Sequence, residues 1–156
     1  MRITLIENGK TRDPFIREGV ELFQKRIERY VPFRIETLPD LKNARTLNMQ
    51  EVQKKEGALL LKRIKDRDYL VLLDERGSSY DSIAFAEHLN QLEAKISHLV
   101  FAIGGPYGFS EELYTHAREK ISLSKMTFSH QLVRLIFMEQ LYRAFTILKG
   151  EPYHHA

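Results

Sequence analysis

The stretch FAIGGPYGFS at residues 101–110 places a glycine-rich turn between an apolar run and a predicted helix. In α/β folds, loops at the carboxyl ends of parallel strands form ligand sites, and glycine lets the backbone approach a ring closely. The loop matches neither phosphate-binding pattern, G-x-x-x-x-G-K-[ST] or G-x-G-x-x-G. Pro106 lacks an amide hydrogen, and Glu111 and Glu112 would repel a phosphate. The loop therefore favours an adenosyl ligand without phosphates, such as S-adenosylmethionine; the alternative is a tight turn that only joins strand to helix.

Two further loops could complete such a ligand site. Residues 123–128 (LSKMTF) mix hydroxyl groups with apolar side chains, which suits a partly apolar adenosyl pocket. Residues 72–74 (LLD) end another apolar run, where Asp74 could bind a ribose hydroxyl or instead cap a turn. Each of these loops alone is typical of an ordinary connection between a strand and a helix.

Apolar runs alternate with helical patterns and predict an α/β fold with a mainly parallel sheet flanked by helices. The predicted strands span residues 2–7, 33–38, 69–73, 98–103 and 121–123. The predicted helices span residues 14–30, 49–65, 83–94, 110–119 and about 130–148. We expect a turn at residues 77–79 and a cap from Asp81 or Ser82 on the third helix. No repeat or linker divides residues 1–156, which we expect to form one domain.

The predicted last helix is apolar around most of its circumference. Its apolar residues are Leu132, Val133, Leu135, Ile136, Phe137, Met138, Leu141, Tyr142, Phe145, Ile147 and Leu148. A surface helix needs only one apolar stripe, so this helix must be covered on two sides. The sheet can cover one side, and a second subunit is the expected cover for the other, which predicts a homodimer. A central helix inside a monomer is the alternative.

Composition and charge narrow the class of protein. The 156 residues are 43% hydrophobic, enough for one core, and include no cysteine, which excludes disulfides and fits a reducing compartment. Residues 1–70 carry 16 Lys and Arg against 11 Asp and Glu, whereas residues 71–156 carry 8 against 10. A basic half suits a partner that carries phosphates, although solvated helix faces give the same pattern. Because no run has the length of a signal peptide or a membrane span, we expect a cytoplasmic protein with no membrane partner. Because the chain has no cysteine, it has no thiolate metal site, and we expect no metal.

Several groups of residues, in this order, resemble one enzyme family. They are LLDERG at 72–77, IGGPYG at 103–108, LSKMTF at 123–128 with His130 and LVR at 132–134, EQLYRA at 139–144, and PYHH at 152–155. Over essentially its whole length the chain is similar to the bacterial large-subunit ribosomal RNA pseudouridine N3-methyltransferases, small members of the SPOUT class. The tail and the last-helix motif make the resemblance specific.

The resemblance implies a SPOUT-type fold with a C-terminal deep trefoil knot, which topology rules alone would disfavour. It implies methyl transfer from S-adenosylmethionine to N3 of a pseudouridine in helix 69 of 23S rRNA, by a homodimer that acts on the assembled ribosome. The predicted cofactor-binding residues are Leu73, Gly104, Gly105, Leu123, Ser124, Lys125, Met126, Thr127 and Phe128.

A base would help this reaction, because the hydrogen on N3 must leave before or during transfer. By residue type the candidates are His130, His154 and His155. His130 could instead cap the last helix, and the other two could belong to a frayed tail. Correct orientation of the nucleophile could also supply much of the rate without a dedicated base.

Other side chains are candidates for contacts to RNA. Tyr153 could stack on an extruded base, and Arg134 and Arg143 could reach phosphates or bases, with a Glu139–Arg143 ion pair as the alternative. The predicted catalytic set is thus His130, Arg134, Tyr153 and His154.

The chain departs from the family pattern at three positions. Ser129 and Gln131 stand where the family commonly has proline, and His155 stands where it often has arginine. Because a histidine is mostly neutral at pH 7 and lacks the guanidinium fork, His155 weakens the expected contact of the tail with RNA. The alternative function is a non-catalytic RNA- or ribosome-binding factor, for which the basic first half would suffice. A dinucleotide-dependent oxidoreductase is disfavoured by the missing fingerprint.

Overall fold

A five-stranded parallel sheet forms the centre of the protein. The computed structural model describes residues 1–155. The strands are β1 (Arg2–Asn8), β2 (Phe33–Leu38), β3 (Tyr69–Ser79), β4 (His98–Ile103) and β5 (Glu119–Ser122), in the order β2-β1-β4-β3-β5. All neighbouring strands pair in parallel, which confirms the predicted sheet. The central β4 is buried along its whole length, which explains its uninterrupted apolar sequence.

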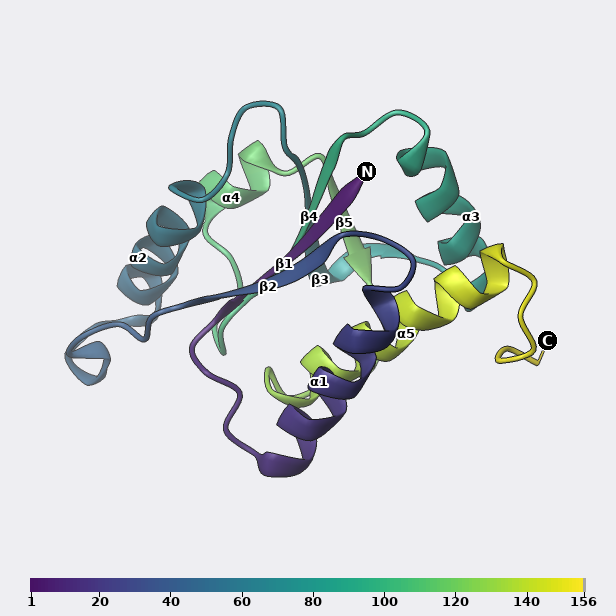
Figure 1. The fold of residues 1–156 in the computed structure, drawn as a ribbon. Helices are drawn as coiled ribbons and strands as arrows, with labels where there is room; N and C mark the ends of the chain where they lie inside the picture. The colour runs from purple at the N-terminus through teal and green to yellow at the C-terminus, as the bar shows by residue number, and fades with distance from the viewer. Residues whose placement is uncertain (156) are drawn as a thin grey trace.

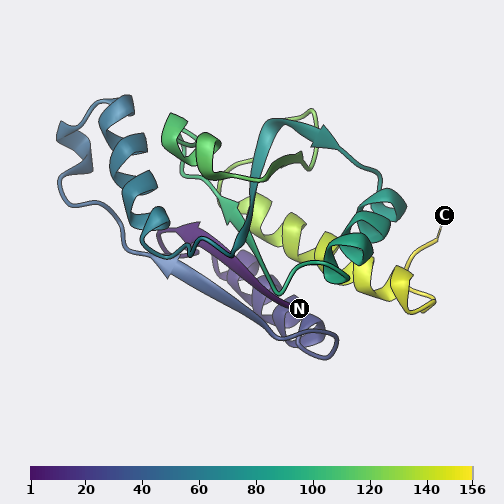
Figure 2. The same cartoon turned by 90° about the horizontal axis from the view of Figure 1, so that it is seen from above.

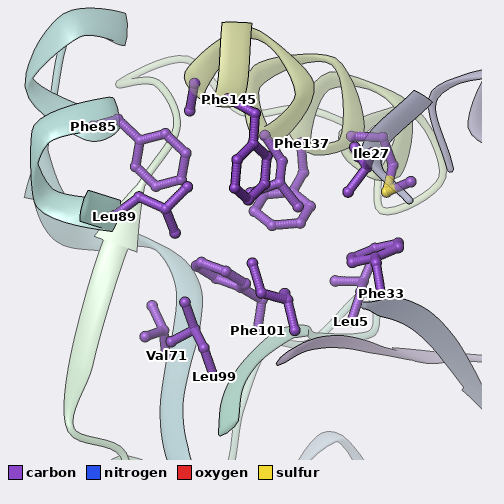
Figure 3. Close-up of a cluster of buried hydrophobic side chains, with 14 of the residues drawn as sticks. Leu5, Ile27, Phe33, Val71, Phe85, Leu89, Leu99, Phe101, Phe137 and Phe145 are labelled. Atoms are coloured by element: carbon purple, nitrogen blue, oxygen red, sulfur yellow. The ribbon is translucent and has the colours of Figure 1, made fainter. Parts of the chain in front are cut away.

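Helices cover both faces of the sheet (Figures 1 and 2). One face carries α1 (Pro14–Ile27), α3 (Ser82–Glu93) and α5 (Leu132–Leu148), and the other carries α2 (Met49–Leu61) and α4 (Glu111–His116). A short 3-10 helix, η1 (Ala44–Thr46), lies in the loop before α2. The larger core lies under α1, α3 and α5, where the rings of Phe101 and Phe137 meet with their centroids 4.8 Å apart (Figure 3). A smaller core lies under α2 and α4.

Local side chains explain where several helices begin. Asn48 caps α2 by accepting the amide of Glu51, and Asp81, rather than Ser82, caps α3 by accepting the amide of Ala84. The predicted helices extend too far at their carboxyl ends, since α1 ends at Ile27, α2 at Leu61 and α4 at His116. The helix of α4 ends because Ala117 is extended, with φ −68° and ψ 141°. The next amide, of Arg118, then bonds to Leu70, so that β5 begins at Glu119 and not at residue 121.

The predicted turn at residues 77–79 is wrong, because β3 continues through it. Ser78 pairs with Ile121 and Ser79 with Ser122, after an irregularity in register that follows Leu73. A Cβ atom on Gly77 would lie 2.4 Å from the carbonyl carbon of Lys120. Glycine is thus required here by the close approach of β5, which is typical of glycine at a strand irregularity.

The apolar circumference of α5 is covered in large part within one chain. Phe137 and Leu141 are fully buried against the sheet. On one flank Tyr30 stacks on Phe145 at 5.5 Å between ring centroids. On the other flank α3 packs against α5 through Phe85 and Leu89 (Figure 3). The single chain therefore covers much of α5, but Leu132 stays 36% exposed and Ile136 half-buried, so the homodimer remains a prediction.

Candidate functional site

A cavity of about 430 Å³ lies at the carboxyl end of β4, beside the irregularity that follows Leu73 in β3 and the loop that follows β5. The predicted cofactor residues that line it are Leu73, Gly104, Gly105, Leu123, Ser124, Met126, Thr127 and Phe128. Lys125 belongs to the same loop but is exposed and does not line the cavity. The predicted loops after β4 and β5 therefore meet at the carboxyl ends of their strands, whereas the third predicted segment, residues 72–74, lies within β3 at its irregularity.

The walls of the cavity are partly apolar and partly acidic. Leu73, Ile103, Leu123 and Val133 contribute apolar surface, and Asp74 lies among them. A site of this kind fits an adenosyl group that carries a positive sulfonium, because the carboxylate would not oppose that charge.

Asp74 lies at the irregularity of β3 and also lines the cavity. Its carboxylate accepts the amide of Arg76 at 2.8 Å and the hydroxyl of Tyr114. Burial, and then the hydrogen bond to Asp74, raise the pKa of Tyr114 to about 12. The Tyr114 phenol therefore stays protonated at neutral pH and keeps donating to Asp74.

The glycine loop folds into a tight hairpin at one side of the cavity. The amide of Gly108, whose φ is +77°, donates to the carbonyl of Gly105 at 3.0 Å. A Cβ atom on Gly105 would lie 2.8 Å from both carboxylate oxygens of Glu56, so the loop backbone presses directly on α2. A Cβ atom on Gly104 would meet the backbone of Gly108 and the ring of Phe109 at ordinary contact distances of 3.4 Å.

Two residues of α2 that contact this loop were not predicted from the sequence. Gln53 lines the cavity and donates from Nε2 to the carbonyl oxygen of Tyr107 at 2.6 Å. Glu56, three residues on, lies against Gly105, and within residues 1–155 its buried Oε1 has no hydrogen-bond partner. Burial, and then the charge of Asp40, raise the pKa of Glu56. The spacing of three places both side chains on one helix face, but nothing local indicates that this face meets the glycine loop.

His130 lines the cavity and is kept neutral by its surroundings. Burial, followed by the positive charges of Arg134 and Arg12, lowers the pKa of His130 below its usual 6.5. His130 does not cap α5: the residue before the helix is Gln131, whose side chain makes no capping bond, and Oγ of Ser129 accepts the amide of Leu132 at 3.0 Å in the preceding turn. A neutral imidazole beside the cavity can accept a proton, so the structure places His130 where a base could act.

Gln131, a departure from the family pattern, has a structural role. Its Oε1 accepts the amide of Arg12 at 2.8 Å, and its Nε2 donates to the carbonyl of Lys10 at 3.2 Å. Gln131 thus holds the loop between β1 and α1 beside the start of α5.

Arg134 lies inside the protein, not on an RNA-facing surface. Its residue is 1% exposed, and its guanidinium donates to the carbonyls of Asn8 and Gly9 and to the hydroxyl of Thr11. It also lies 3.4 Å from the carboxylate of Glu7. Buried and fully engaged, Arg134 does not fit the predicted direct contact with phosphates or bases. Its bonds instead join β1 to α5.

The tail at residues 151–155 folds back onto α5. The hydroxyl of Tyr153 donates to Glu139 at 3.1 Å, and the ring of Tyr153 lies 4.7 Å from the Arg143 guanidinium. Arg143 also donates to Nδ1 of His154 at 3.1 Å and forms the predicted ion pair with Glu139 at 2.5 Å. Because of these contacts, residues 151–155 do not form the frayed tail that was the alternative. Ala156 lies outside the described residues.

The tail and the cavity lie apart in this chain. Neither Tyr153 nor His154 lines the cavity, and the chain end lies on the side of the molecule away from α2 (Figures 1 and 2). The structure therefore brings His130 to the cavity but leaves the other three predicted catalytic residues elsewhere.

Within residues 1–155, no group of three or more His, Cys, Asp or Glu side chains is arranged to hold a metal ion. None of the helices in the same range is long and apolar enough to cross a membrane.

Comparisons with known proteins give a consistent assignment. A family model described as "Predicted SPOUT methyltransferase" matches residues 1–154. A protein of Parabacteroides distasonis named "Ribosomal RNA large subunit methyltransferase H" is 51% identical over 156 residues, covering 99% of each chain. Proteins with the same name from Christiangramia forsetii and Bacteroides thetaiotaomicron are 49% and 47% identical, again over 99% of each chain.

Proposed function

This chain belongs to the SPOUT methyltransferase family, and we propose that it transfers a methyl group from S-adenosylmethionine to large-subunit ribosomal RNA. The proposed acceptor is N3 of a pseudouridine in helix 69 of 23S rRNA in the assembled ribosome. The observation that carries the proposal is the cavity in which eight of the nine predicted cofactor residues meet.

The residues around the cavity fit the proposed cofactor. Leu73, Leu123 and Val133 would hold the adenine and ribose by apolar contact, and the glycine loop permits close approach of a flat ring. The acceptor of Asp74 suits a ribose hydroxyl. When bound, S-adenosylmethionine supplies an electrophilic methyl group on a positively charged sulfur.

The residues of the chain would prepare the acceptor nitrogen. Nitrogen N3 becomes a nucleophile when its hydrogen leaves, and the neutral imidazole of His130 is placed at the cavity to accept that proton. Arg134 is a positioning residue, because its positive charge helps to keep His130 neutral.

The tail would serve the RNA and not the cofactor. Tyr153 presents an aromatic ring, and Arg143 and His154 are joined at its side. Aromatic rings and guanidinium planes are the groups on which proteins stack unpaired RNA bases.

We further propose a homodimer, a knotted C-terminal half and a cytoplasmic location, each carried over from the family. A dimer surface is supported by exposed apolar side chains on neighbouring helices, Phe15 and Leu22 of α1 and Leu132 of α5. Leu22→Asp should therefore reduce the molar mass in light scattering, whereas Phe137→Asp would disrupt the core of the single chain. An unmutated chain that is monomeric at micromolar concentration would exclude the dimer.

The proposed activity is tested with purified chain, ribosomes and S-adenosylmethionine labelled in the methyl group. We expect label in 23S rRNA, located by mass spectrometry to one pseudouridine of helix 69. Ribosomes from a strain that carries the gene should accept no label, because the position is already methylated. Binding to ribosomes without transfer would favour the non-catalytic alternative.

A further inference from the structure

A second hollow lies at the opposite edge of the sheet from the first cavity. It has a volume of about 380 Å³ and is lined by residues at the amino ends of β1 and β2, among them Arg2, Thr4 and Arg34, together with Lys65 from the loop before β3. The side chains of Arg2, Arg34 and Lys65 are all exposed. Because the sheet is parallel, this hollow is separated from the first cavity by the length of the strands.

The hollow belongs to a wider basic surface, which we call the amino edge. It consists of exposed cationic residues in the loops that lead into the strands, or at the start of a strand: Arg2, Arg29, Arg34, Lys62, Arg63, Lys65, Arg67, Lys95 and Arg118. The same segments contain fewer carboxylates, Glu28, Glu36, Asp66, Asp68 and Glu119. The amino edge therefore has a clear excess of positive charge.

Three of these carboxylates are already engaged, among them Glu119, which accepts the hydroxyl of Tyr69 at 2.6 Å and contacts His88 at 2.7 Å. Asp68 is buried. Its carboxylate accepts a hydrogen bond from the amide of Lys65 at 2.9 Å, and it lies 2.8 Å from Nδ1 of His98. Glu36 is shared between Arg34 at 2.5 Å and Arg63 at 3.7 Å. None of the three can neutralise Arg2, Lys65 or Arg67 fully, so positive charge remains free to meet a polyanion.

The carboxyl edge, which holds the cofactor cavity, lacks such an excess. Its exposed or half-buried acidic residues are Asp13, Asp40, Glu56, Asp74, Glu75, Glu111 and Glu112, and its exposed basic residues are Lys10, Arg12, Lys42, Arg45, Arg76 and Lys125. Glu7 and Arg134 are buried and pair with each other, so neither contributes an exposed charge. Affinity for RNA depends largely on cations that neutralise phosphates and release counterions. The carboxyl edge is poorly equipped for that task.

We infer that the amino edge is a second RNA-binding surface, which holds the phosphodiester backbone of ribosomal RNA at a distance from the modified nucleotide. The inference rests on the proposed function, since it takes ribosomal RNA as the partner. Contacts of this kind position a protein on RNA without reading its sequence. The carboxyl edge would then select the base, and the amino edge would supply salt-sensitive attraction.

The amino-edge variant is Arg2→Gln/Lys65→Gln, which removes two positive charges from the wall of the hollow. These residues are chosen because cations directly after a helix, such as Lys62, also complement the helix dipole. The matched control is Lys54→Gln/Lys55→Gln, which removes two exposed positive charges from the outer face of α2. Ribosome affinity is measured for each protein over a series of KCl concentrations.

We expect the amino-edge variant to lose affinity at low salt and its log–log salt slope to become shallower by about 2, close to 1 for each phosphate contact. The control should keep the slope of the unmutated chain, and both variants should keep their affinity for S-adenosylmethionine and their melting temperature. If the amino-edge variant is unstable, Arg2→Lys/Lys65→Arg, which conserves charge, should restore both fold and slope.

Equal slopes in the amino-edge variant and the control would overturn the inference. Calorimetry with inorganic phosphate tests whether the hollow binds a small anion and not RNA. If Arg2→Gln/Lys65→Gln abolishes phosphate binding but leaves the salt slope of ribosome binding unchanged, the inference is also overturned. Methyl transfer by the unmutated chain is scored separately. Absent transfer with a changed slope would reject the proposed activity and leave the RNA-binding surface in place.

Discussion

Nη2 of Arg134, in the first turn of α5, lies 2.6 Å from the carbonyl oxygen of Asn8, the last residue of β1. Two residues separated by more than a hundred positions are therefore joined directly. The same guanidinium binds the carbonyl of Gly9 at 2.9 Å and lies 3.4 Å from Glu7. This bonding fixes where α5 starts relative to the sheet, and with it the place of His130 at the cavity.

Replacing Arg134 should destabilise the fold. We expect Arg134→Met to lower the free energy of unfolding by about 3–5 kcal/mol, because the buried Glu7 loses its partner. Urea denaturation measures this loss. Arg143→Met, which breaks a half-exposed ion pair, should cost about 1 kcal/mol or less. A loss under 1 kcal/mol for Arg134→Met would show that the buried pair contributes little.

The glycine loop should tolerate one added carbon at residue 104 but not three. A Cβ atom at Gly104 makes ordinary contacts of 3.4 Å, so Gly104→Ala should bind S-adenosylmethionine within about threefold of the unmutated chain. The outer carbons of Gly104→Val would be forced against Gly108 and Phe109, and cofactor binding should be lost. Calorimetry on folded protein compares the two. Unchanged affinity in Gly104→Val would contradict the proposed role of the loop.

Gln53 should hold the tip of the glycine loop in place. Removing its 2.6 Å bond to the carbonyl of Tyr107 with Gln53→Ala should weaken S-adenosylmethionine binding about two- to tenfold, the range of one hydrogen bond. Gln50→Ala, an exposed glutamine on the same helix, is the control and should bind normally. Equal affinities in the two variants would mean that the loop keeps its shape without Gln53.

The sequence predicted the order of the elements because that order depends on patterns within short segments. It predicted the meeting of three segments because parallel strands bring their carboxyl ends to the same side of a sheet. The continuation of β3 beyond Gly77 was missed, since it depends on pairing with Ile121, more than forty residues away. The burial of Arg134 was missed for the same reason: its partners lie at the other end of the chain. The docking of Gln53 and Glu56 on the glycine loop likewise depends on tertiary packing, which the helical pattern of α2 does not encode.

If His130 accepts the N3 proton, the rate of methyl transfer should depend on its protonation. The pKa of His130 lies below 6.5, so the rate should rise with pH through that lowered value and level off by neutral pH. The folded state binds fewer protons there, so stability from this group is present above 6.5 and is lost as pH falls through the folded pKa. Single-turnover rates over a pH series measure the profile.

A variant tests whether His130 causes the bend in the pH profile, that is, the fall in rate at acidic pH. His130→Asn should be slower and should lose the bend, whereas His116→Asn, at an exposed histidine of α4, should keep it. A bend that persists unchanged in folded His130→Asn would assign the proton transfer to another group.

Deleting residues 152–156 should separate the two binding events. No described residue of the tail lines the cavity, so S-adenosylmethionine affinity should stay unchanged in calorimetry. Methyl transfer to ribosomes should fall at least tenfold, because the deletion removes Tyr153 and leaves Arg143 without His154. A loss of cofactor affinity would instead make the tail a lid on the cavity. Full transfer would show that the tail only packs against α5.

A point variant shows which part of the tail matters. Tyr153→Phe removes the 3.1 Å bond to Glu139 but keeps the ring that lies over Arg143 and beside Tyr142. If the ring stacks on an RNA base, Tyr153→Phe should keep most of the transfer rate and Tyr153→Ala should lose it. The expected loss of binding free energy in Tyr153→Ala is about 1–3 kcal/mol, the contribution of one stacked base. Equal losses in both variants would assign the effect to the hydroxyl and its bond to Glu139. Equal retention would move the RNA contact to Arg143 and His154, which remain in both variants.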